Sequence, residues 1–238
     1  MTIPLQTGFV YGSLASRRFG RSLGINLLPT DQKICNLDCV YCQYENTPPG
    51  GKPRFPSLKE LTDEFMDVVG SLRSHQRSVD WIIIAGNGEP TLHPQFPEAV
   101  DCLLGLRNEF LPNVPVGILS NSSTCHLPPM RQALSCLEGR YMKLDAGNIP
   151  DAAVLAGLHD LKGTVLQSLF FEGIQQNTAS AEIGEWMDIV RRVRPKSVQI
   201  YTIDRSTRLK GLRPVPKEVL QRISDDLFAR TEIPSRLY

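Results

Sequence analysis

One apolar run constrains the fold more than any other part of the chain. It covers residues 81–85 (WIIIA) and stops at Gly86-Asn87-Gly88. An apolar run without alternation is typical of a strand that is covered on both faces, as strands of parallel sheets are. Shorter segments of the same character predict five more strands, over residues 24–28, 116–119, 141–145, 164–171 and 197–203.

Helix-like segments lie between the predicted strands. The first begins with the capping box Ser57-x-x-Glu60, followed by apolar residues at helical spacing. Others are predicted over residues 95–110, 128–137, about 180–193 and about 216–230. Alternating strands and helices imply right-handed βαβ units and a parallel sheet, either doubly wound or closed into a partial barrel. Periodicity does not choose between them, but ligands bind at the carboxyl ends of the strands in both.

Composition and charge exclude several classes of protein. The chain has 238 residues, 41% of them hydrophobic, and a net charge of +1. No run approaches the roughly 18 apolar residues of a membrane helix. Residues 1–10 lack the basic flank and apolar core of a signal peptide. We therefore expect a cytoplasmic protein with no membrane partner.

Three of the six cysteines fall in one short segment, Cys35-x3-Cys39-x2-Cys42. Structural zinc usually takes four ligands in two separated pairs, and the remaining cysteines form no second pair. Three thiolates suit a [4Fe–4S] cluster, whose fourth iron stays open to a non-protein ligand. The alternatives are a zinc knuckle that borrows His75 or His93, and cysteines without any metal. The other cysteines are Cys102, Cys125 and Cys136.

Polar residues follow the next three predicted strands. These are Gly86-Asn87-Gly88-Glu89, Ser120-Asn121, and the pair Lys143 and Asp145, which share one strand face. Glycines let the backbone approach a ligand closely. A lysine on a buried strand needs a partner, so Lys143 either pairs with Asp145 or meets a bound molecule.

At this point the sequence resembles a known family. Cys35-x3-Cys39-x-Tyr41-Cys42 is similar to the signature of the radical S-adenosylmethionine (SAM) superfamily. Residues 16–26 (SRRFGRSLGIN), 86–94 (GNGEPTLHP), 143–146 (KLDA) and 201–205 (YTIDR) resemble its small single-domain branch related to the wyosine-type tRNA-modifying synthases. The resemblance implies a partial (β/α)6 TIM-like barrel of parallel strands, open on one side. It also implies a single domain over residues 1–238, with an extension at 1–23, a core at 24–205 and a final helix at 216–230.

The resemblance further implies an activity. Cys35, Cys39 and Cys42 would hold one [4Fe–4S] cluster, and SAM would bind its open iron. Reductive cleavage would give a 5′-deoxyadenosyl radical, which abstracts hydrogen from a substrate. Further residues would contact the cofactor or act on the substrate: Tyr41, Gly86, Asn87, Gly88, Glu89, Ser120, Asn121 and Tyr201 as cofactor contacts, and Lys143 and Asp145 as catalytic residues.

The sequence leaves the partner, the substrate and two alternative functions open. The electron donor would be a protein such as flavodoxin or ferredoxin, and the substrate a small molecule or a nucleic acid. One alternative is a non-catalytic iron–sulfur redox or regulatory protein, and another is an activase or modifier acting on a protein or tRNA. Only 18 residues separate Asp145 from Thr164, so we expect a trimmed fourth βα unit.

The net charge hides an uneven distribution. Residues 1–24 carry three arginines and no acid, and residues 191–213 carry eight basic residues against Asp204. If the first and last strands flank an open side, both segments border its mouth. We therefore expect an anionic substrate, attracted by the local field. Arg205 would bind it or form a surface ion pair.

Overall fold

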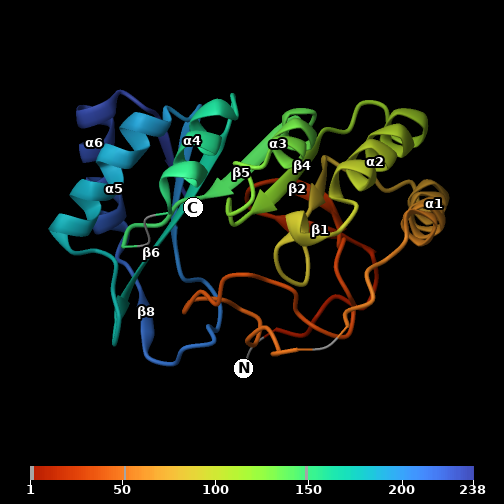
Figure 1. Cartoon of the computed structure of the whole chain (residues 1–238), viewed down its shortest axis with the longest axis horizontal. Helices are drawn as coiled ribbons and strands as arrows, with labels where there is room; N and C mark the ends of the chain where they lie inside the picture. Colours follow the sequence, from red (N-terminus) through yellow and green to blue (C-terminus); the bar gives the residue numbers. More distant parts are fainter. Residues whose placement is uncertain (1–2, 51, 148–149) are drawn as a thin grey trace.

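Strands and helices alternate along the chain and build one sheet with helices on its outer side (Figure 1). The computed structural model describes residues 3–50, 52–147 and 150–238. Within them the strands are β1 (Val10–Ser16), β2 (Gly20–Ile25), β3 (Trp81–Ile84), β4 (Val116–Ser120), β5 (Gly139–Lys143), β6 (Val165–Gly173), β7 (Ser197–Thr202), β8 (Leu212–Pro214) and β9 (Ser235–Leu237). The helices are α1 (Leu58–Ser74), the 3-10 turn η1 (Pro90–Leu92), α2 (Phe96–Phe110), α3 (Pro128–Ser135), α4 (Ala152–Asp160), α5 (Ser180–Val193) and α6 (Lys217–Thr231).

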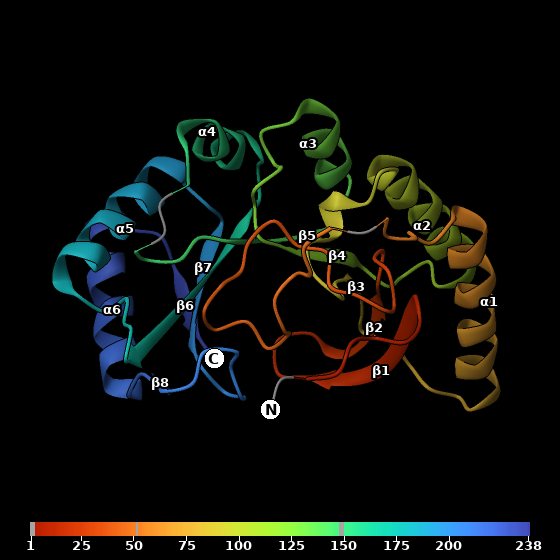
Figure 2. The same cartoon turned by 60° about the horizontal axis from the view of Figure 1, so that its bottom comes forward.

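The sheet is parallel through its centre. The strand order is β1-β2-β3-β4-β5-β6-β7-β9, with β1 antiparallel to β2 and β8 antiparallel to β6. The sheet curves without closing, so it forms an open, TIM-like partial barrel. Figure 2 shows the helices along the outside of the arc, and the segment between β2 and α1 crossing the concave interior.

Helix α1 shows how the sequence positions these layers. The Ser57 hydroxyl accepts the Glu60 N–H, and the Glu60 carboxylate accepts the Ser57 N–H, which confirms the predicted capping box. The buried face of the helix contributes to the core between helices and sheet with Leu61, Phe65, Val69 and Leu72. In the described residues no helix is both long and apolar enough to cross a membrane.

The structure differs from the sequence prediction at both edges of the sheet. The first parallel strand covers Gly20–Ile25 rather than residues 24–28, and β1 pairs with it as a hairpin. Short strands β8 and β9 add to β6 and β7. Strands β8 and β9 were missed because each has three residues and pairs with an existing strand, so neither needs a long apolar run. The fourth crossover does keep a helix, α4, of nine residues.

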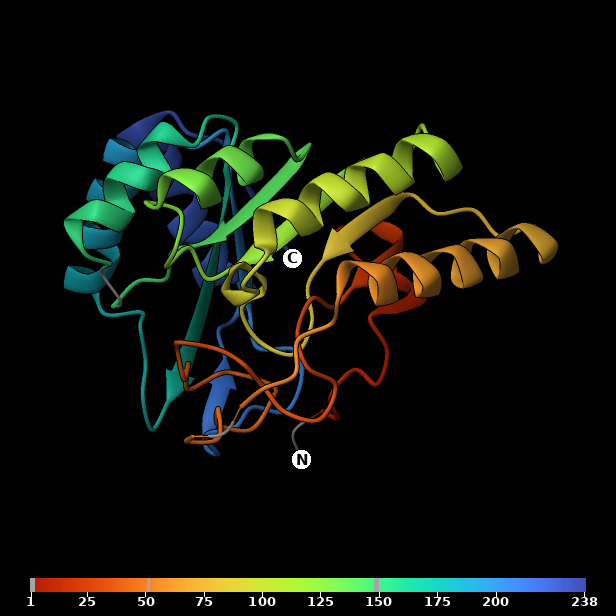
Figure 3. The ribbon, with the colours of Figure 1, turned by 45° about the vertical axis from the view of Figure 1, so that its right-hand side comes forward.

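The cysteines lie at the carboxyl ends of the parallel strands. Figure 3 shows the end of β6 pointing towards the loop that follows β2. Residue Ile34 of that loop forms a parallel bridge with Gly88, just beyond β3. The loop containing residues 33–47, here called the cysteine loop, is therefore held at the end of the sheet where parallel folds bind ligands.

Candidate active site

Three free thiols lie on the cysteine loop. Cys35, Cys39 and Cys42 are each half-buried and form no disulfide. A turn closes between the second and third, where the Cys42 N–H donates to the Cys39 carbonyl over 2.9 Å. The Thr47 hydroxyl donates to the Cys35 carbonyl over 3.1 Å, so the two ends of the loop are joined.

The first anchor of the loop is the glycine-containing turn after β3. The Ile34 N–H donates to the Asn87 carbonyl, and the Glu89 N–H donates to the Ile34 carbonyl, both over 2.9 Å. Gly88 has a φ of +137°, and a Cβ there would lie 1.9 Å from the Ile34 carbonyl oxygen. Gly88 is thus required for the close approach of the cysteine loop to this turn.

The second anchor comes from the segment after β7. The Arg208 N–H donates to the Cys42 carbonyl over 2.8 Å, and the Leu209 N–H donates to the Val40 carbonyl over 3.1 Å. The Arg208 guanidinium also donates to the Asp38 carbonyl over 2.8 Å. Two segments far apart in the sequence therefore fix the backbone on which the thiols are carried.

The surroundings of the thiols are suited to negative charge. The Lys33 side chain is only 3% exposed and its ammonium lies 3.0 Å from Asp38. Burial alone would lower the pKa of Lys33, but Asp38 and the nearby Cys42 and Cys35 raise it above its usual value. Asn121 points an amide N–H at the Cys35 sulfur, 3.7 Å away. A buried cation and a donor beside two thiols favour a bound group with net negative charge.

These donors fit an iron–sulfur cluster. In the ranges that the structure describes, no three His, Cys, Asp or Glu side chains are arranged to hold a single metal ion. Thiolates are the ligands that an iron–sulfur cluster prefers, and three of them leave one iron of a four-iron cluster open. Burial raises the pKa of the Cys35 and Cys39 thiols. The raised pKa favours the protonated thiols in the absence of a metal. Metal binding would reverse this, because a coordinating thiol is deprotonated.

Residues 86–89 contact the protein itself. A Cβ on Gly86 would meet the Asn26 side chain at 2.2 Å. The Asn87 side chain is fully buried and donates to the carbonyls of Gln6 and Pro29, both over 2.9 Å. The glycine-rich turn therefore approaches the protein's own backbone and side chains. Its predicted contact with a cofactor stays a prediction.

The Glu89 carboxylate also contacts other groups of the protein. It is 2% exposed, and burial raises its pKa. One oxygen accepts from the Ser120 hydroxyl over 2.9 Å and from Thr91, and the other accepts from the Asn121 N–H over 2.6 Å. Glu89 thereby holds the end of β4, which carries the amide that faces Cys35.

A charged network spans the interior behind the cysteine loop. The Lys143 ammonium lies 3.3 Å from Asp145 and donates to the Tyr201 hydroxyl over 2.9 Å. It also lies 4.4 Å from the centre of the Tyr41 ring. The Tyr41 hydroxyl donates to Asp145, whose other oxygen accepts from the Leu169 N–H. Both sequence interpretations of Lys143 are compatible with this arrangement, since the pair with Asp145 lies inside the barrel.

Tyr41 lines three cavities in the part of the chain that the structure describes. One, of about 320 Å³, is also lined by Cys39, Asn121, Lys143 and Asp145, and we call it the cofactor cavity. A second, of about 490 Å³, lies between the β1–β2 hairpin and the end of β7 and is also lined by Tyr201; we call it the lateral cavity. The third, of about 500 Å³, shares Cys39 and Asp145 with the cofactor cavity and extends to Asn177.

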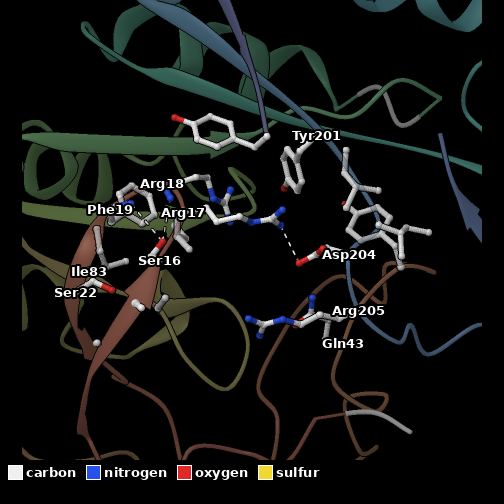
Figure 4. Close-up of a pocket in the computed structure, with 18 of the residues that line it drawn as sticks. Ser16, Arg17, Arg18, Phe19, Ser22, Gln43, Ile83, Tyr201, Asp204 and Arg205 are labelled. Atoms are coloured by element: carbon white, nitrogen blue, oxygen red, sulfur yellow. Dashed lines mark hydrogen bonds and ion pairs between the residues drawn. The ribbon is translucent and has the colours of Figure 1, made fainter. Parts of the chain in front are cut away.

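Arginines border the lateral cavity (Figure 4). Arg17 and Arg18 come from the hairpin tip and Arg205 follows β7, which confirms that parts of the two basic segments meet. Arg17 forms an ion pair of 2.8 Å with Asp204 across the open side. The sequence hypothesis was wrong for residues 191–196, which lie at the end of α5 and before β7, at the opposite end of that strand.

The predicted zinc alternative gains no support from the histidines. The imidazole of His93 is engaged on both nitrogens, with the Pro56 carbonyl and the Gln95 N–H, each at 3.0 Å. His75 is exposed at the end of α1, where its ring contacts the Ser71 carbonyl at 2.8 Å.

Two site residues, Lys33 and Arg208, were not predicted from the sequence. Nothing in the sequence indicates that Lys33 is buried or that Arg208 reaches the cysteine loop.

The sequence of the chain is similar to those of known proteins. Residues 30–135 match the family model described as the radical SAM superfamily. This match covers a little under half of the chain, and over that part the chain is similar to the superfamily. The chain is 26% identical over 229 residues to a UPF0026 protein of Helicobacter pylori strain J99, which covers 89% of this chain and 71% of that protein. It spans only 33–42% of three further curated relatives.

Two solved structures share the fold at low sequence identity. A radical SAM methyltransferase from Sphaerobacter thermophilus has a TM-score of 0.64 at 14% identity, over 91% of this chain and 65% of that one. The archaeal TYW1 has a TM-score of 0.56 at 13% identity, over 89% of this chain and 72% of that one. At 13–14% identity these likenesses show the shared fold, and the match over residues 30–135 is what relates the chain to enzymes that use SAM and an iron–sulfur cluster.

Proposed function

We propose that this enzyme binds one [4Fe–4S] cluster at Cys35, Cys39 and Cys42 and uses it to cleave SAM reductively. The observation that carries the proposal is the cysteine loop itself: three free thiols, two backbone anchors and the buried Lys33 at the carboxyl ends of the strands. When bound and reduced, the cluster and SAM supply a 5′-deoxyadenosyl radical that abstracts hydrogen from the substrate. A protein such as flavodoxin or ferredoxin would provide the electron.

The cofactor cavity is the place we assign to SAM. It is lined by Cys39 and Asn121 from the cluster side and by Lys143 and Asp145 from the sheet. Lys143 offers an ammonium for a carboxylate, and Asp145 offers oxygens for hydroxyl or ammonium groups. Because Tyr41 lines both cavities, a substrate in the lateral cavity would approach the cofactor beside this ring.

The charge at the lateral cavity supports an anionic substrate. Arg17, Arg18 and Arg205 line it, whereas Asp204 is the one acidic side chain among the described residues that line it. A cavity with excess positive charge concentrates anions despite a net charge near zero. The Lys143–Asp145 pair and the Tyr41 ring would shield the reacting groups from water.

The decisive experiment is anaerobic reconstitution with iron and sulfide, followed by reduction with dithionite in the presence of SAM. We expect 5′-deoxyadenosine and methionine, measured by mass spectrometry, and a cluster spectrum that the Cys39→Ala variant lacks. The exposed Cys136 provides the matched control, since Cys136→Ala should keep both. An intact cluster that yields no 5′-deoxyadenosine would favour the non-catalytic iron–sulfur protein instead.

A further inference from the structure

The lateral cavity contains a guanidinium with one nitrogen that has no hydrogen-bond acceptor among the described residues. Arg18 comes from the hairpin tip, and its charged group lies 5.0 Å from the centre of the Tyr201 ring and 5.8 Å from that of Phe19. Its Nη1 atom is buried and has no hydrogen-bond partner. Buried polar atoms nearly always have a partner, so this donor indicates an acceptor that belongs in the cavity.

A second arginine faces the same space from the other edge of the sheet. Figure 4 shows Arg205 extending from the segment after β7 towards the space that Arg17 and Arg18 enter from the hairpin tip. Within the described ranges Arg205 has no hydrogen bond or ion pair. Arg17 differs, because its guanidinium is held by Asp204 at 2.8 Å. Two arginines therefore have no anion of the protein to bind.

We propose that the lateral cavity binds the phosphate group of a small phosphorylated substrate, held between Arg18 and Arg205. That the rest of this molecule loses a hydrogen atom to the radical rests on the proposed function. Two guanidinium groups from opposite sides suit a tetrahedral anion, whose oxygens point in several directions. A carboxylate has its two oxygens in one plane and matches a single guanidinium fork.

The hairpin tip supplies a further donor. The Ser16 oxygen accepts from the backbone N–H groups of Arg18 and Phe19, over 3.2 and 3.3 Å, which leaves its proton free to donate. The cavity of about 490 Å³ is also far larger than a phosphate. The remaining volume extends to Tyr41, so it offers room for an organic body between the phosphate and the cofactor cavity.

The test is a titration of the full chain, with its cluster reconstituted and without SAM, using inorganic phosphate as the probe. Binding is followed by calorimetry or by 31P NMR. Arg18→Gln and Arg205→Gln should each weaken binding about tenfold, or about 1.4 kcal/mol. The control Arg222→Gln removes an exposed guanidinium on α6 and should leave binding unchanged.

The Arg17–Asp204 ion pair offers a variant with the opposite effect. Asp204→Asn removes the competing carboxylate and releases Arg17, so phosphate should bind about threefold more tightly, as expected for the loss of an exposed ion pair. Because Asp204 is exposed, this variant is expected to fold even if Arg18→Gln does not.

Each outcome decides the proposal separately from SAM cleavage. Wild-type binding by Arg18→Gln and Arg205→Gln would overturn the site, as would unchanged or weaker binding by Asp204→Asn. Acetate that binds as tightly as phosphate would overturn the phosphate assignment. The same preparations are assayed for 5′-deoxyadenosine. Its absence alongside the predicted phosphate pattern would refute the proposed function and leave the anion site standing.

Discussion

The ammonium of Lys143 lies 2.9 Å from the hydroxyl of Tyr201 and so joins β5 to β7 across the barrel interior. The same ammonium pairs with Asp145, whose carboxylate accepts the Tyr41 hydroxyl of the cysteine loop. Burial alone would lower the pKa of Lys143, but Asp145 and Tyr201 raise it above the usual value. Lys143 therefore stays charged at neutral pH, and a single cation connects the cysteine loop to both sides of the cavity region.

Removing that cation should destabilise the protein. Asp145 is only 6% exposed, so Lys143→Met leaves a buried carboxylate without its counter-ion. We expect the free energy of unfolding to fall by about 3 kcal/mol, measured by urea denaturation. 5′-Deoxyadenosine formation should also be lost.

A double variant separates structure from function. Lys143→Met combined with Asp145→Asn removes both charges and should recover most of the lost stability. It should not recover SAM cleavage if Lys143 contacts the cofactor. Wild-type stability of Lys143→Met alone would show that the pair does not support the fold.

Gly88 should control the seating of the cysteine loop. With a φ of +137° and the Ile34 carbonyl 1.9 Å from a built Cβ, alanine requires the backbone to move. We expect Gly88→Ala to lose most of its iron after reconstitution while its far-UV circular dichroism remains helical. Gly105→Ala is the matched control, since a Cβ there meets no atom within 4 Å, and its iron content should equal that of the wild type. Full iron loading of Gly88→Ala would disprove the role of this contact.

Much of the fold follows from the sequence because its central strands are unambiguous. The run ending at Ile84 is a buried parallel strand, and Ser57 and Glu60 begin α1 as expected. The hairpin of β1 was missed, because Val10–Ser16 carries no long apolar run and pairs at the edge. The choice of a partial barrel came from the family resemblance, since periodicity is the same in an open sheet.

The candidate site was predicted unevenly. Bunched cysteines locate the loop, and strand ends locate Lys143 and Asp145 correctly inside the cavity region. The structure shows that Asn26 and Ile34 approach Gly86 and Gly88 closely, while the predicted cofactor contact of these glycines stays a prediction. A local pattern shows that the backbone is closely approached, but only the tertiary fold shows what approaches it.

The neutral His93 ring should make stability depend on pH. Burial lowers the pKa of His93, and Nδ1 accepts the Gln95 N–H while Nε2 donates to the Pro56 carbonyl. The unfolded chain, with an ordinary histidine pKa of about 6.5, takes up the proton first as the pH falls. The contribution of His93 is therefore present above about pH 6.5 and is lost below it.

Melting temperatures between pH 7.5 and 5 test this. His93→Gln should be less stable at pH 7.5, by about 1 kcal/mol from its hydrogen bonds, and should converge on the wild type towards pH 5. His75→Gln alters an exposed ring and should follow the wild-type profile. A constant difference between His93→Gln and the wild type at every pH would contradict the assignment.

Glu89 decides whether this turn positions the site or contacts the cofactor. Its carboxylate accepts from Thr91, Ser120 and the Asn121 N–H, so an amide in its place would direct an N–H group at a donor. We expect Glu89→Gln to lower the free energy of unfolding by about 3 kcal/mol, since each hydrogen bond to a charged group is worth about 1.5–3 kcal/mol. Glu109→Gln, at an exposed position on α2, should leave stability unchanged. Unchanged stability of Glu89→Gln, together with a tenfold weaker affinity for SAM, would show instead that this carboxylate acts on the cofactor.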